Sequence, residues 1–127
     1  EEAGAPDRHK KAIVNAGFHD TMRTRIYTGR PLRLRKTGYV LKWENERKEE
    51  IDRLCSKGKI PYKLDLERLS KSLTPLDWDA ESEMYPLFMG QVAGAIKQVQ
   101  SAKQIINEML QDAVAIIKRN KNLISKL

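Results

Sequence analysis

Residues Met22–Lys36 limit the fold more than any other stretch, because their side chains alternate between two kinds. From Met22 to Thr28 every second residue is apolar or threonine, and the residues between them are arginines and one tyrosine. This two-residue period is typical of a half-buried strand. Gly29 permits a positive φ and Pro31 fixes its own φ, so a turn follows. The Leu-Arg-Leu-Arg run after it predicts a second extended segment.

The same stretch carries the excess charge of the protein. Between Thr21 and Trp43 there are seven Lys or Arg and no Asp or Glu, and the net charge of the whole chain is +7. Two arginine-bearing strands joined by a turn are suited to holding an anion. The alternative is a solvated basic edge that discourages strand-to-strand aggregation, and the sequence leaves both interpretations open.

The remaining residues favour helices, so we expect a mostly α fold with one short strand pair. Apolar stripes and end signals, among them a Ser-Ala-Lys-Gln capping box at Ser101, place the helices. The expected helices run from Pro6 to Gly17, from Leu41 to Lys57, around Leu64 to Leu69, from Tyr85 to Val99 and from Ser101 to about Asn120. The acidic run Asp77, Asp79, Glu81 and Glu83 predicts a mobile loop beside the arginine segment.

Gly90 and Gly94 are four residues apart in the expected helix Tyr85–Val99, so one face of that helix would carry no side chains. Glycine inside a helix costs about 1 kcal/mol relative to alanine, so such a face needs compensation. Close packing against another element is one explanation. Space for a flat ligand, with the amide of Gln91 facing its polar edge, is the other.

Few residues are available for metal or thiol chemistry. The chain has two histidines and one cysteine, so no zinc-ligand set can be assembled; we expect surface histidines and a buried Cys55. A single cysteine rules out an internal disulfide and predicts a reducing, cytoplasmic setting. No run of about 20 apolar residues and no signal-peptide pattern occurs, so we expect no membrane partner.

Four stretches, taken in order along the chain, resemble one enzyme family. They are Glu1–Ala3 with His9–Lys10, the run Thr28–Thr37, the charged stretch Trp43–Lys57, and Phe-Met-Gly-Gln-Val-Ala-Gly at Phe88–Gly94. Together they are similar to the fungal nitronate monooxygenases, also called 2-nitropropane dioxygenases, which are FMN enzymes on a TIM barrel. The similarity covers nearly all of this chain but only about the C-terminal third of such an enzyme.

The resemblance implies a C-terminal fragment of an FMN-binding TIM-barrel (α/β) enzyme. Residues 1–20 would hold the last barrel helix, residues 21–40 a basic strand-turn-strand arm, and residues 41–127 a helical cap and the C-terminal helices. The implied reaction is oxidation of an alkyl nitronate with O2 by bound FMN. The glycine-rich phosphate loops and the catalytic histidine of the family match nothing here, so we expect no catalytic residue and no activity from this chain alone.

The resemblance also implicates four residues at the site. Gly90 and Gln91 would face the flavin, because the Gly-Gln segment of the family lies near its active site. Arg30 or Arg33 would steer the anionic nitronate, and no motif decides between them. No metal ligand is expected.

Three other functions stay open at this point. The barrel is shared with FMN-dependent enoyl reductases, so the substrate class is less certain than the cofactor. A small basic helical module that binds nucleic acid is compatible with the charge of +7, although no nucleic-acid motif occurs and we expect no such partner. A helix bundle that binds a protein partner is the third, and the sequence does not set the oligomeric state.

Overall fold

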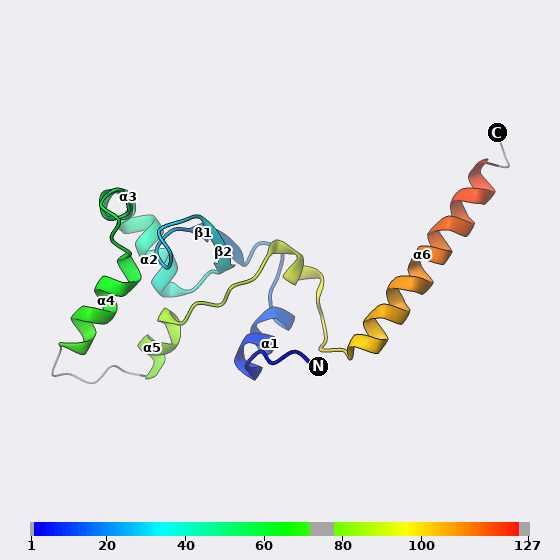
Figure 1. Cartoon of the computed structure of the whole chain (residues 1–127), viewed down its shortest axis with the longest axis horizontal. Helices are drawn as coiled ribbons and strands as arrows, with labels where there is room; N and C mark the ends of the chain where they lie inside the picture. The colour runs from blue at the N-terminus through cyan, green and yellow to red at the C-terminus, as the bar shows by residue number, and fades with distance from the viewer. Residues whose placement is uncertain (1, 72–77, 125–127) are drawn as a thin grey trace. The chain divides into compact units, whose positions relative to one another are not determined.

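The computed structural model describes residues 2–71 and 78–124. Within them the chain is mostly helical with a two-stranded sheet, which confirms the expected mixture of elements (Figure 1). The chain divides into two compact units. One is Asp7–Lys97, and the other combines the residues up to Pro6 with those from Gln98 onward. Both strands and every candidate site residue belong to the unit Asp7–Lys97.

The elements keep one set of labels from here on. In chain order they are α1 (Asp7–Val14), β1 (Thr21–Thr24), β2 (Leu32–Arg35), α2 (Gly38–Glu46), α3 (Lys48–Ser56), α4 (Pro61–Ser70), α5 (Trp78–Met84), the 3-10 helix η1 (Gln91–Ala95) and α6 (Ala102–Ile124). None of the described helices is long and apolar enough to cross a membrane.

β1 and β2 form the antiparallel pair that the alternating pattern predicts. Their register runs from Thr21 opposite Arg35 to Thr24 opposite Leu32. Gly29 lies in the connecting segment with a φ of 74°, the left-handed conformation expected there. The strand-turn-strand prediction is therefore confirmed in type, and the structure adds the register.

The first strand is shorter than the pattern predicts. It ends at Thr24, and the following Ile26 and Tyr27 are both buried. The Tyr27 hydroxyl donates a hydrogen bond to the Met84 carbonyl at 2.8 Å. Because a buried tyrosine needs apolar surroundings and a polar partner together, this segment leaves the sheet and enters the core.

The larger core joins the strand pair to the helices that follow it. Its buried members are Ile26, Tyr27, Leu34, Val40, Trp43 and Ile51. The largest of the fully buried side chains is Trp43, whose Nε1 donates to Asp65 Oδ2 at 3.0 Å. The Tyr39 hydroxyl donates to the same oxygen at 2.9 Å. A carboxylate of α4 thus satisfies two aromatic donors of α2.

The single helix predicted for Leu41–Lys57 is wrong, because the structure has two helices, α2 and α3, that meet at Arg47. The backbone of Arg47 has φ −126° and ψ 26°, outside the helical range. Its guanidinium lies 3.4 Å from the centroid of the Trp43 ring and donates to Glu50 Oε2 at 2.7 Å. These contacts accompany a bend that buries both Trp43 and Ile51. The predicted stop at Gly58, with φ 67°, is confirmed.

The helix predicted for Tyr85–Val99 is also wrong. Phe88 instead forms a β-bridge with Leu34, and a short 3-10 helix follows at Gln91–Ala95. The amide of Arg35 donates to the Leu87 carbonyl at 2.9 Å. β2 therefore has partners on both sides, and the interpretation of its arginines as a free basic edge does not hold.

The acidic run is a helix and not the predicted mobile loop. α5 begins at Trp78 and ends at Met84, so three of the four acidic residues lie within it, while Asp77 lies outside the described residues. A Glu83 carboxylate oxygen accepts from the amide of Gly38, and the Glu83 carbonyl accepts from Thr37 Oγ1 at 2.8 Å. Glu83 therefore bonds to the residues at the start of α2.

The second unit contains α6. Ser101 Oγ accepts from the Gln104 amide at 3.2 Å, as the predicted capping box requires, while the Gln104 side chain bonds to Glu108 instead of returning to Ser101. Glu2 Oε2 accepts from the Ala102 amide at 2.9 Å, and this hydrogen bond lowers the pKa of the Glu2 carboxyl below its usual value. The helix start is therefore capped twice.

Candidate functional site

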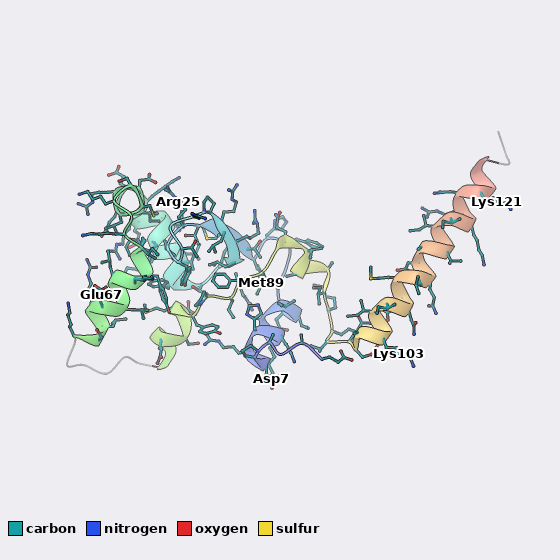
Figure 2. The ribbon with its side chains drawn as sticks, viewed as in Figure 1. Asp7, Arg25, Glu67, Met89, Lys103 and Lys121 are labelled. Carbon is teal, nitrogen blue, oxygen red and sulfur yellow. The ribbon has the colours of Figure 1, made fainter. Side chains whose placement is uncertain are left out.

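The Gly-Gln segment is held against β2 by main-chain hydrogen bonds. The amide of Met89, labelled in Figure 2, donates to the Arg33 carbonyl at 3.4 Å, and Gly90 and Gln91 follow directly. Arg33 and Gly90, both predicted site residues, are therefore neighbours across the backbone. The two residues are 57 positions apart in the sequence, so no local interaction brings them together.

The side chain of Arg33 points along the sheet toward β1. Its Nη1 donates to Thr21 Oγ1 at 3.1 Å and lies 3.5 Å from the Thr21 carbonyl. Arg30 differs: it lies in the turn before β2 and is exposed, and only its main chain is engaged, with Thr28 Oγ1. Within the described part of the chain no contact joins Arg30 to Gly90 or Gln91. The structure thus brings the main chain of Arg33, but not its guanidinium, to Met89 beside the Gly-Gln segment.

Other arginines of the basic stretch also have internal partners. Arg25 forms an ion pair with Asp52, and Arg35 Nη1 donates to the Ala12 carbonyl at 3.3 Å. These contacts join the strand pair to α3 and to α1. Much of the positive charge in this stretch therefore has a structural use.

α1 covers the Gly-Gln segment from the side away from β2. His9 Nε2 donates to the Phe88 carbonyl at 2.8 Å, and Arg8 donates to Ser82 Oγ at 2.7 Å. The Arg8 guanidinium also lies 4.9 Å from the centroid of the Tyr85 ring. A second core cluster completes the contact; its members are Ala12, Ala16, Leu87, Met89 and Ala93. Figure 1 shows α1 below the chain that leads to η1.

The role of His9 could not be found from the sequence. The sequence predicts a surface histidine, whereas the structure shows His9 partly buried and bonded to a carbonyl 79 positions away. No local pattern reports a contact over that separation. His19, by contrast, is exposed as predicted.

The two glycines of the segment have different environments. A Cβ built on Gly94 would lie 2.5 Å from the Phe18 amide nitrogen. Position 94 therefore requires glycine, because the backbone at Phe18 passes close to it. A Cβ built on Gly90 would meet nothing within 4 Å. The expected bare helix face is absent, but Gly90 is open and Gln91 beside it is exposed.

The Gly-Gln segment is also joined to the larger core through an aromatic contact of Phe88. The Phe88 ring meets the Tyr27 ring edge-on, with centroids 6.2 Å apart. Burial raises the pKa of the Tyr27 hydroxyl well above its usual value, so this group stays neutral and remains a hydrogen-bond donor. Tyr27 is therefore a packing partner at neutral pH and not an acid or base.

The described residues fit one edge of a flavin but not its phosphate. Open space at Gly90 and an exposed amide at Gln91 suit a flat ring that carries hydrogen-bonding groups on its rim. No glycine-rich loop that could cradle a phosphate is present in the chain. Among the residues that the structure describes, no group of three His, Cys, Asp or Glu could hold a metal ion.

Comparisons with known proteins identify the family of the chain. The family model for nitronate monooxygenase matches residues 1–112, so the chain belongs to the nitronate monooxygenase family. A curated relative from Mycobacterium tuberculosis, named "Putative monooxygenase Rv1533", is 25% identical over 126 residues, which are 99% of this chain and 33% of that protein. The chain therefore spans about a third of the length of the relative it matches.

A solved structure has a similar fold. FabK from Thermotoga maritima aligns with a TM-score of 0.59 and 23% identity, over 92% of this chain and 34% of that one. This likeness concerns the fold alone. The alignment again covers most of this chain and about one third of a longer protein.

Proposed function

We propose that this chain acts as the C-terminal part of an FMN-dependent nitronate monooxygenase that oxidises alkyl nitronates with O2. The family match over residues 1–112 supports the class. The observation that carries the site is the Gly90–Gln91 pair, which is open on one side and held on the other by β2 and α1. An element that must contact a cofactor accurately needs this combination.

Each proposed contact follows from the environment of the residue. Bound FMN supplies the redox chemistry, passing electrons from nitronate to oxygen. Gly90 has no side chain between the backbone and the ring, and the Gln91 amide can donate to or accept from the polar rim. The guanidinium of Arg33 is turned toward Thr21 of β1, so its charge, like that of the exposed Arg30, attracts the anion at longer range.

The division of labour along the chain is part of the proposal. Residues 1–20 form the last barrel helix, residues 21–40 the basic arm, and residues 41–127 the cap and C-terminal helices. The phosphate loops and the catalytic base belong to the preceding part of the enzyme. Neither histidine of this chain is assigned as the base, because His9 is bonded to a main-chain carbonyl and His19 matches no catalytic motif.

The test uses the full-length enzyme. It should purify with bound FMN and consume O2 when given an alkyl nitronate. Gln91→Leu should weaken FMN binding about two- to tenfold, the range expected for one hydrogen bond, and the exposed Gln98→Leu should not. A protein that binds no flavin, or an equal effect of the two substitutions, would refute the proposal at the level of cofactor or of site.

The same preparation separates the alternatives. Reduction of an enoyl thioester with a nicotinamide cofactor, without nitronate oxidation, would favour the enoyl reductase. Affinity for RNA or DNA that falls steeply with salt would favour the nucleic-acid module. The internal partners of Arg25, Arg33 and Arg35 argue against the second, because a nucleic-acid surface needs its basic side chains free.

A further inference from the structure

Two hydrogen bonds hold the peptide group between Phe88 and Met89 from opposite sides. Its carbonyl accepts from His9 Nε2 at 2.8 Å, and its N–H donates to the Arg33 carbonyl at 3.4 Å. The bond is trans, so these two groups point in opposite directions. α1 and β2 therefore each form a hydrogen bond to this one peptide group. Gly90 follows it after one further residue, Met89.

The apolar contacts of α1 do not fix the segment to the same degree. Ala12 and Ala16 pack against Leu87, Met89 and Ala93, which sets how close α1 and the segment lie. Contacts between apolar side chains are not directional, so they resist a slide along the helix or a rotation of the peptide plane less than a hydrogen bond does. A hydrogen bond to one defined carbonyl resists both, because its strength falls steeply as the angle worsens.

We infer that His9 is a positioning residue that sets the orientation of Gly90 and Gln91 toward the flavin. This inference rests on the proposed function. His9 acts through the Phe88 carbonyl and touches neither cofactor nor substrate. Nε2 carries the proton, because a carbonyl oxygen can only accept. The frame behind it is firm, since Arg35 of β2 donates to the Ala12 carbonyl of α1 at 3.3 Å.

The side chain at position 9 offers a sharp set of variants. His9→Gln can place an amide N–H about where Nε2 lies, whereas His9→Asn is too short and His9→Leu has no donor. His19→Leu is the matched control, because His19 is the other histidine and is exposed. All four are compared in the full-length enzyme by FMN affinity and by hydrogen exchange at the Met89 amide.

The Leu and Asn variants should raise the Kd for FMN about two- to tenfold, the range expected for one lost hydrogen bond. Both should also speed exchange of the Met89 amide, because that N–H belongs to the same peptide group as the Phe88 carbonyl. His9→Gln should stay within about twofold of the natural enzyme in both measurements. His19→Leu should change neither.

Several results would overturn the inference. If Gln and Asn weaken FMN binding equally, position 9 has a packing role only. If the Met89 amide of His9→Asn exchanges at the same rate as in the natural enzyme, the hydrogen bond from His9 does not hold the segment. The comparison of His9→Gln with His9→Asn decides this even if His9→Leu does not fold. Failure of the natural enzyme to bind FMN would refute the proposed function instead, while the Met89 exchange would still report on the hydrogen bond from His9.

Discussion

A methyl group added at Gly94 should destabilise the protein, whereas the same change at Gly90 should not. The added Cβ at Gly94 would lie 2.5 Å from the Phe18 amide nitrogen and 2.8 Å from its Cα. Favourable contacts between heavy atoms begin near 3.5 Å, so one backbone must move by about 1 Å. The result is a clash between two main chains, which no side-chain rotation relieves.

The turn that carries Phe18 has little freedom to move away. The Gly17 amide donates to Asp20 Oδ2 at 2.8 Å, and the Asp20 carbonyl accepts from the Lys36 amide at 2.8 Å. The turn is thereby tied to the residue that follows β2. Overpacking against a fixed neighbour costs about 1–3 kcal/mol, and we expect Gly94→Ala in this range.

Gly90 provides the matched control. Its φ of −83° and ψ of 171° suit alanine, and the space around it is open. Gly90→Ala should be neutral or should stabilise by about 0.4–1 kcal/mol through the unfolded state. In the full-length enzyme it should nevertheless weaken FMN binding, because the methyl group would face the proposed ring.

Urea denaturation followed by circular dichroism gives the two unfolding free energies, and flavin fluorescence gives the two FMN affinities. The expected outcome is crossed: Gly94→Ala loses stability, and Gly90→Ala loses flavin affinity at unchanged stability. Equal stability of the two variants would refute the close approach at Phe18. Undiminished FMN affinity in Gly90→Ala would remove Gly90 from the flavin site.

Three further predictions concern the core around α2, α3 and α4. Asp65→Leu removes the acceptor of the Tyr39 hydroxyl and the Trp43 indole, so the free energy of unfolding from urea denaturation should fall by about 1–3 kcal/mol. The exposed Glu67→Leu should change it by no more than about 0.5 kcal/mol, and equal effects of the two substitutions would contradict the hydrogen bonds. Burial raises the pKa of Tyr39 well above its usual 10, so the native state holds this proton more tightly, and the free energy of unfolding should fall as pH rises above about 10. A Tyr39→Phe variant should show a smaller fall, the remainder coming from Tyr27, whose pKa is also raised by burial; an unchanged fall would contradict the role of Tyr39. The hydrogen bond from Arg47 lowers the pKa of Glu50 below 4.5, so its stabilising contribution is present above about pH 4.5 and is lost as pH falls further; the stability curves of the natural protein and Glu50→Gln should converge in acid, and parallel curves would disprove the coupling.

Local rules predicted the elements whose causes are local. The strand pair follows from a two-residue alternation and from Gly29, and the start of α6 follows from Ser101 and its N3 amide three residues later. Each of these needs only residues within one turn or one hairpin. The end of α3 near Gly58 belongs to the same group, since a positive φ after a helix favours glycine.

Tertiary contacts decided the elements that local rules predicted wrongly. Residues 85–99 have a proline and apolar spacing compatible with a helix, but the free side of β2 presents the Arg33 carbonyl and the Arg35 amide. Unpaired main-chain groups beside a buried Leu34 are costly, so the segment pairs with them instead. The bend at Arg47 has a similar origin in its contacts with Trp43 and Glu50.

The candidate site shows the same limit. Gly90 and Gln91 could be proposed as candidates from the family resemblance, because a motif consists of residues that are adjacent in the sequence. His9 could not, because its partner is a main-chain carbonyl, which any residue type provides, 79 positions away. Contacts that use the backbone of the partner leave no mark on the partner's side chain, so a single sequence cannot reveal them.

The position of β2 explains how the basic stretch and the Gly-Gln segment are joined in one structural unit. β2 pairs with β1 on one side and bridges to Phe88 on the other, so it is the middle of three extended segments. Its leucines and arginines face opposite sides, and Leu34 is buried while Arg33 and Arg35 bond to Thr21 and to α1. The arginines therefore fix the frame on which Gly90 sits before any of them can attract a substrate. In the proposed site, replacing Arg35 should weaken FMN binding by the full-length enzyme through the position of α1, whereas replacing Arg30 should leave FMN affinity unchanged and raise only the KM for the proposed anionic substrate.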